Sequence, residues 1–94
     1  MKAERIRPGQ VVISRAGRDA GQCYMVLSLY GFRVAVADGV RRRIQNPKHK
    51  NVKHLRLVAD PDPEWERRFG SGERITDADI RRVLWVLVEK EGCQ

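Results

Sequence analysis

The chain has 94 residues, 41% hydrophobic and 33% charged, with a net charge of +7. This length is enough for one domain with a modest core. No apolar run approaches the roughly 20 residues that cross a bilayer, and the charged N-terminus MKAERIRPG lacks the apolar stretch of a secretory signal. We therefore expect a single cytoplasmic domain with no membrane association.

Positive charge is concentrated in the first part of the chain. Residues 1–59 carry 13 Lys or Arg and 3 acidic residues, a net charge of +10, whereas residues 60–94 carry 6 basic and 9 acidic residues, a net charge of −3. Arg outnumbers Lys 14 to 5, and the guanidinium group suits bidentate phosphate contacts and stacking on bases. This asymmetry favours a basic face directed at a polyanion, and a generally basic soluble surface is the alternative.

Short strands separated by turn signals are predicted as far as residue 58. A polar loop with two glycines is expected at 15–22, a tight turn at Gly31 and a hairpin turn at Asp38-Gly39. Pro47 lies within a long basic stretch and predicts an exposed loop there. The expected strands cover residues 10–14, 23–30, 32–37 and 55–58, with a further short strand directly after the Asp38-Gly39 turn. Several short strands with tight turns indicate a small barrel.

Residues 60–94 predict a linker followed by helix. Two prolines interrupt 60–63, one helical turn is expected at 64–69, and glycines make 70–72 flexible. Thr76 and Asp79 resemble a capping box at the start of a helix over 77–89. One apolar stripe of this helix is expected to pack on the barrel, and it contains Ile80, Val83, Leu84, Leu87 and Val88. Gly92 is expected to end the helix, and Trp85 falls off the stripe, either at its edge or in an interaction surface.

The segment Gly17-Arg18-Asp19-Ala20-Gly21, with hydrophobic strand residues on both sides, resembles the glycine-containing core of the KOW motif. The resemblance extends over residues 10–58, about half of the chain, through Cys23, the strand at 34–38, the arginine cluster and Lys53-His54-Leu55. This part of the chain is similar to the KOW-domain family that includes the large-subunit ribosomal proteins fourteen-e, six-e and twenty-seven-e. It looks most like a bacterial branch described as KOW-domain RNA-binding proteins.

The resemblance implies a mainly β protein. Residues 1–59 would form an SH3-like barrel of the translation-protein type, and residues 60–94 an acidic linker and a C-terminal helix packed on it in the same compact unit. It also implies a ribonucleoprotein role, with loops that contact RNA, which is ribosomal RNA in the best-known members. Ribosomal proteins are expected as further partners.

Candidate RNA-binding residues fall in two segments, the Gly17–Gly21 loop and the basic stretch from Arg41 to Arg56. The positions that match the family are Arg15, Gly17, Arg18, Gly21, Arg41, Arg42, Arg43, Lys53 and His54. Charge and expected exposure add Lys48 and Lys50, and His49 is expected to face the RNA as a donor. If Arg41–Arg43 form a strand, Arg41 and Arg43 share one face and Arg42 lies opposite.

Three other functions compete with RNA binding. An SH3-like barrel also suits a protein–protein interaction module, here a translation or transcription adaptor using the C-terminal helix and Trp85. His49 and His54 lack a C-x-x-C partner for zinc, and the acidic run at 60–66 lacks a paired base for catalysis. Cys23 and Cys93 are far apart in sequence, and Cys23 is expected as a small buried hydrophobe rather than part of a disulfide framework. We predict neither an enzyme nor a bound metal or cofactor.

Overall fold

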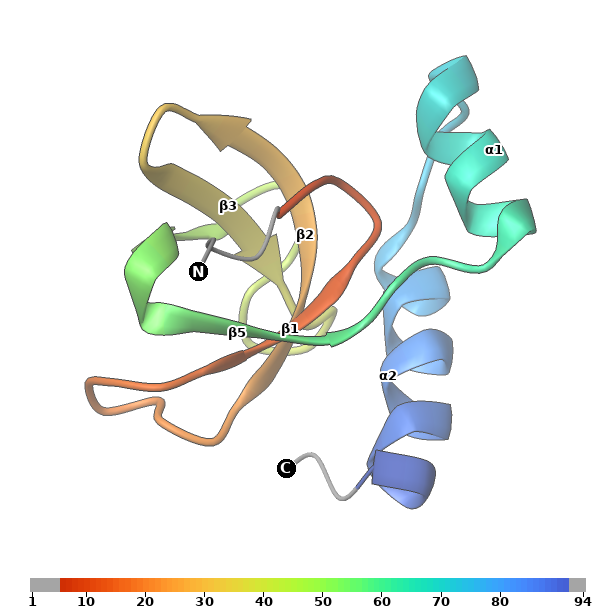
Figure 1. The fold of residues 1–94 in the computed structure, drawn as a ribbon. Helices are drawn as coiled ribbons and strands as arrows, with labels where there is room; N and C mark the ends of the chain where they lie inside the picture. Colours follow the sequence, from red (N-terminus) through yellow and green to blue (C-terminus); the bar gives the residue numbers. More distant parts are fainter. Residues whose placement is uncertain (1–5, 92–94) are drawn as a thin grey trace.

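The computed structural model describes residues 6–91, with the backbone alone described for 88–91. Five strands are followed by two helices (Figure 1). In chain order the elements are β1 (Val11–Ser14), β2 (Cys23–Tyr30), β3 (Arg33–Ala37), β4 (Lys48–Asn51), the 3-10 turn η1 (Val52–His54), β5 (Leu55–Ala59), α1 (Pro63–Ser71) and α2 (Asp77–Glu91). The protein is therefore mainly β with a C-terminal helix, as predicted.

The five strands form one antiparallel sheet in the order β4-β3-β2-β1-β5. Its two edge strands, β4 and β5, are joined only by the three residues of η1. In a flat sheet of this order the edges would lie about 19 Å apart, whereas a 3-10 turn rises only about 2 Å per residue. The sheet must therefore curl until its edges approach, and the ribbon shows this curvature (Figure 1).

Alternate residues of the central strands build two cores on opposite faces of the sheet. The inner core, inside the curl, contains Ile6, Val12, Tyr24, Val26, Val34, Val36 and Leu55. The outer core lies between the sheet and the helices, and its buried members are Val11, Cys23, Met25, Ala37, Ile80 and Leu84. Because both faces of β1 and of the first half of β2 are buried, these segments are apolar almost throughout.

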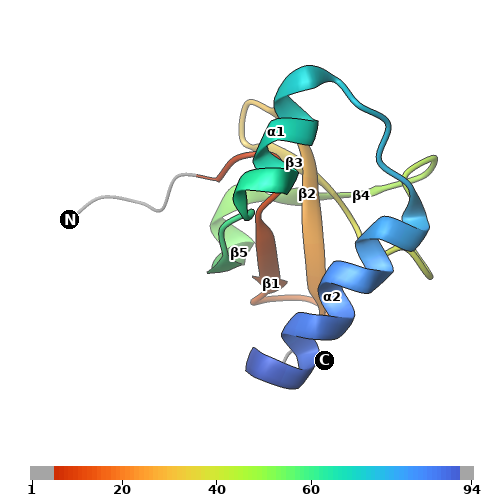
Figure 2. The ribbon, with the colours of Figure 1, turned by 90° about the vertical axis from the view of Figure 1, so that its right-hand side faces the viewer.

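Helix α2 covers the outer face of the sheet (Figure 2). Its capping box forms as expected, since Thr76 Oγ1 accepts from Asp79 N and Asp79 Oδ2 accepts from Thr76 N, both at 3.1 Å. Ile80 and Leu84 are buried beneath it, and Val83 and Leu87 pack beside them. The side chain of Val88 and the predicted stop at Gly92 lie outside the described residues.

Three expectations were wrong in detail. Arg41–Arg43 do not form a strand but lie in a loop of residues 38–47, and the strand comes later, at Lys48–Asn51. The helical turn expected at 64–69 is the nine-residue helix α1, which includes Gly70 and Ser71. Cys23 is buried as expected but is disulfide-bonded, while Cys93 lies outside the described residues.

Candidate nucleic-acid interface

The β1–β2 loop carries the glycine-containing motif and is folded by its own backbone. Gly17 and Gly21 have φ values of +88° and +93°, in the left-handed region that side chains disfavour. The N–H groups of Ala20, Gly21 and Gln22 all donate to carbonyls within residues 14–19. These three N–H groups are therefore not available to an anion.

Asp19 holds this loop against the sheet. Its Oδ1 accepts hydrogen bonds from Lys50 Nζ at 2.8 Å and Ser14 Oγ at 2.9 Å, and its Oδ2 accepts from Tyr24 OH at 2.7 Å. Lys48 Nζ lies 3.3 Å from the same Oδ2. Lys50 also donates to Ala16 O and Ser14 Oγ, so its ammonium group has three partners within the β1–β2 segment.

This network fixes the ionisation of two groups. Burial by itself raises the pKa of the Asp19 carboxyl, but the hydrogen bonds that it accepts, led by that from Lys50, outweigh burial and hold the pKa well below its usual range. Burial and the neighbouring Asp19 carboxylate raise the pKa of the Tyr24 hydroxyl well above its usual range. Asp19 is therefore ionised, and Lys50 and Lys48 of the same protein compensate its negative charge.

The β3–β4 loop carries Arg41–Arg43 and is anchored at two levels. Asp38 Oδ1 accepts from the backbone N–H groups of Val40 and Arg42 at 2.9 and 3.0 Å, which closes the turn locally. Helix α2 then holds the loop, because Arg81 donates to Gly39 O at 2.6 Å and Asp77 Oδ1 accepts from Ile44 N at 2.9 Å.

Gly39 allows the loop and the helix to approach this closely. Its φ is +81°, and a Cβ at this position would lie 2.6 Å from Asp77 O and 2.9 Å from Arg81 Cγ. Any other residue would be strained and would push the loop away from α2.

The two loops meet around a small pocket of about 250 Å³. Four cationic side chains line it, and they are Arg18 from the first loop, Arg41 and Arg42 from the second, and Lys48 from β4. Two carboxylates, Asp19 and Asp38, also line it, but Asp19 is paired with Lys50 and Asp38 accepts from backbone N–H groups. Four cations against two carboxylates leave the lining with a net charge of +2, and one of these cations, Lys48, is itself paired with Asp19. The hydrogen bonds of the two carboxylates also hold the loops in place.

The structure brings together only part of the predicted set. Lys50 was expected to be exposed, but its side chain is 8% exposed and pairs with Asp19 beneath the pocket, so that expectation was wrong. Arg43 is exposed and does not line the pocket, and its Nε donates to Val40 O.

The other predicted residues lie elsewhere. Arg15 is exposed, and its backbone N–H donates to His54 O, which brings it near Lys53 and His54 of η1. His49 is on the outer face of β4, where its ring lies 6.1 Å from that of Tyr30. The candidate interface therefore consists of the pocket and a flank at η1.

Sequence reasoning missed the residues that hold the pocket together. Asp19, Asp38 and Arg81 contact the loops without having been assigned a role there. One signal was available, since Asp19 and Asp38 are two of only three acidic residues in the first 59 positions. An isolated acid among many cations is more often paired than solvated when the segment folds.

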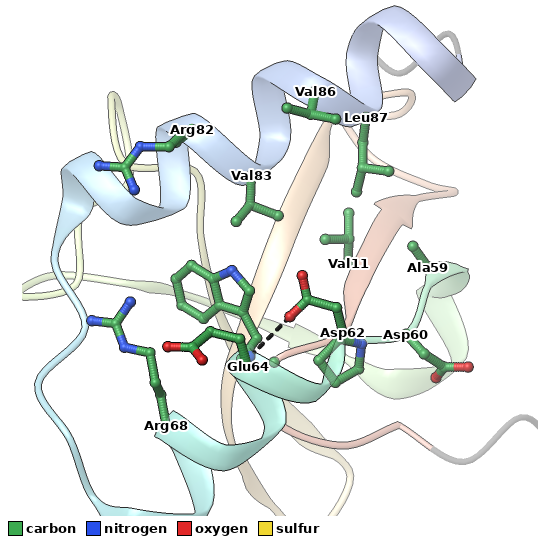
Figure 3. Close-up of a pocket in the computed structure, with 13 residues that line it drawn as sticks. Val11, Ala59, Asp60, Asp62, Glu64, Arg68, Arg82, Val83, Val86 and Leu87 are labelled. Carbon is green, nitrogen blue, oxygen red and sulfur yellow. Dashed lines mark hydrogen bonds between the residues drawn. The ribbon is translucent and has the colours of Figure 1, made fainter.

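A larger hollow of about 590 Å³ lies between α1, α2 and the ends of β1 and β5 (Figure 3). Val11, Val83 and Leu87 form apolar walls, with Arg68 and Arg82 toward one end (Figure 3). Its lining also includes three carboxylates, those of Asp60, Asp62 and Glu64. Two arginines against three carboxylates leave its lining with a net charge of −1, so we do not include this hollow in the interface.

Two further findings bear on function. Within residues 6–91, no group of three or more His, Cys, Asp or Glu side chains is arranged to hold a metal ion, and no helix in that range has the length and apolar character to span a membrane. Neither a scan against protein-family models nor a search of curated proteins found a match to this chain.

Proposed function

We propose that this protein binds RNA through the basic pocket between the β1–β2 and β3–β4 loops. The observation that carries the proposal is the convergence on one pocket of three arginines from two loops, with Lys48 of β4 beside them, while the two carboxylates of the pocket have partners within the protein. Because contacts within the protein anchor the backbones of both loops, ordering the loops adds little to the cost of binding a phosphate. The resemblance to KOW-domain proteins gives the ligand class, which is structured RNA and in particular ribosomal RNA, with ribosomal proteins as neighbours.

An SH3-like barrel of the KOW type is part of the same proposal. It is supported by the strand order, in which β1 lies between β2 and β5, and by the 3-10 turn that joins the two edge strands. In such a barrel the β1–β2 and β3–β4 loops emerge on one side. The pocket between these two loops is consistent with that arrangement.

A protein-interaction module is the second candidate. The observation in its favour is that α2 exposes apolar side chains, with Trp85 and Val86 66% and 46% exposed. Exposed apolar residues of this kind are typical of protein interfaces. RNA binding is preferred because four cationic side chains line the pocket between the two loops.

Single arginine substitutions test the pocket with a matched control. Arg41→Ala and Arg42→Ala each remove one lining charge, and Arg43→Ala removes one charge from the same loop outside the pocket. Wild-type affinity for a structured ribosomal RNA fragment should fall with salt with a log–log slope on the order of −4, if about five phosphates are neutralised. The first two variants should bind more weakly than Arg43→Ala and reduce the slope by about one unit each.

Two results would count against the proposal. If wild type does not bind RNA even at low salt, RNA is not the ligand. If Arg43→Ala weakens binding as much as Arg41→Ala and Arg42→Ala do, the pocket is not the contact and the charge of the loop acts nonspecifically.

A further inference from the structure

A second hollow of about 390 Å³ adjoins the basic pocket on the side of α2. Gln22, Asp38 and Arg41 line both hollows, so the two hollows border on each other at these three residues. The remaining lining comes from Cys23, Val40, Arg81, Leu84 and Trp85. Anything held by its phosphate at Arg41 would therefore have this hollow beside it.

The chemistry of the hollow is apolar and cationic. Val40 and Trp85 are 59% and 66% exposed, and Arg41 and Arg81 line the same space. Asp38, the one carboxylate among the lining residues, accepts two backbone hydrogen bonds. This combination suits a flat, uncharged aromatic group attached to an anion.

The acidic start of α2 does not oppose such a ligand. Asp77 accepts from Ile44 N, and Asp79 accepts from Thr76 N and pairs with Arg68 at 3.2 Å. Both carboxylates thus have partners within the protein. Arg81, one turn further along α2, is exposed and also donates to Gly39 O. Trp85 therefore shares its hollow with two cations, Arg81 of α2 and Arg41 of the β3–β4 loop.

We infer that Trp85 is a stacking residue for an unpaired nucleobase of the RNA whose phosphates occupy the basic pocket. This inference rests on the proposed function and specifies its ligand as RNA with a single-stranded or bulged nucleotide. Bases within a duplex are stacked on one another, so an aromatic side chain reaches only a base that is splayed out. Stacking on a tryptophan tolerates any base, because every base presents a π face.

The test compares binding of a short single-stranded oligouridine with binding of a blunt RNA duplex of the same length. Trp85→Ala should lower affinity for the oligouridine about tenfold or more, the loss expected for one stacked base, and leave duplex affinity nearly unchanged. The salt slope should not change, because no charge is removed. Trp85→Phe should retain most of the affinity while abolishing the tryptophan quenching that oligouridine causes in the wild type. Trp65, in the hollow between α1 and α2, remains as an internal reference.

Phe32→Ala is the matched comparison, since Phe32 is an aromatic residue 77% exposed that lines neither hollow. Its carbonyl oxygen accepts from Val52 N of η1, so this variant also tests stacking at the η1 flank. Thermal melts of every variant confirm folding. If Trp85→Ala binds oligouridine as tightly as the wild type does, or if Phe32→Ala loses more affinity than Trp85→Ala, the inference is overturned while RNA binding stands. Equal losses of affinity for oligouridine and duplex in Trp85→Ala would also overturn the inference. If the wild type binds a ribosomal protein and only the Trp85 variants lose that binding, Trp85 belongs to a protein interface instead. If neither RNA binds the wild type at low salt, the proposed function itself fails.

Discussion

Lys50→Met should destabilise the protein strongly, although it lowers the net positive charge of a basic chain by only one. The ammonium group is buried and lies 2.8 Å from Asp19 Oδ1, and methionine has a similar length without a charge. Removing one partner of a buried ion pair costs about 3–5 kcal/mol, because the other charge is left uncompensated. Lys48 Nζ remains 3.3 Å from Asp19 Oδ2, so we expect the lower end, about 3 kcal/mol. For a chain of this size that corresponds to a fall in Tm of roughly 12–24 °C.

Thermal or urea denaturation followed by circular dichroism measures this loss, with two comparisons. Lys48→Met removes the more exposed cation of the same carboxylate and should cost no more than about 1 kcal/mol. Asp19→Asn combined with Lys50→Met should be less destabilised than the sum of the single variants, since no unpaired charge remains. A Lys50→Met variant as stable as Lys48→Met would refute the reasoning, because Lys50 would then behave as an ordinary surface lysine.

Three further predictions concern stability. Gly39→Ala should lower the free energy of unfolding by more than about 1–2 kcal/mol, the strain of a left-handed residue, because its Cβ also meets α2. Gly72→Ala, with nothing within 4 Å of its Cβ, should show the strain alone. Equal melting temperatures for the two variants would contradict the close approach. Ile80→Ala should cost about 2–5 kcal/mol, since Ile80 is fully buried under α2, and an unchanged melt would mean that α2 does not pack as described. Because the folded pKa of Asp19 is lowered, its stabilisation is fully present above about pH 4 and is lost as the pH falls below that value. The difference in unfolding free energy between wild type and Asp19→Asn should therefore narrow below pH 4, and a constant difference would show that the carboxylate charge is not responsible.

Most of the sheet could be predicted because apolar alternation and glycine turns mark its strands. The predicted limits of β2 match the structure, and β5 extends one residue beyond its prediction. β4 could not be found in this way, because its sequence KHKN has no apolar residue. It forms a strand because Lys48 and Lys50 pair with Val36 and Val34 in register and share their inward face, where Asp19 meets both charges.

The candidate site was predictable by segment but not by geometry. The glycine-containing motif identified the first loop and charge the second, yet nothing local shows that Arg18 lies across one pocket from Arg41 and Arg42. The partner that buries Lys50 lies 31 residues earlier in the chain, so charge alone indicated exposure. The Asp38-Gly39 signal did mark a turn, but the Asp38 side chain binds the backbone that follows and opens a loop where a hairpin was expected.

The anchoring of the basic loop by α2 has a consequence for how the molecule matures during synthesis. The last buried residue of the inner core is Leu55, so all buried residues of this core are synthesised before the helices. Domains generally fold from the N-terminus as the chain emerges. The contacts that hold Gly39 and Ile44 come from Asp77 and Arg81, which are made much later. A nascent chain would thus carry its arginines on an untethered loop until the final helix docks, and recognition would be acquired as the last step of folding.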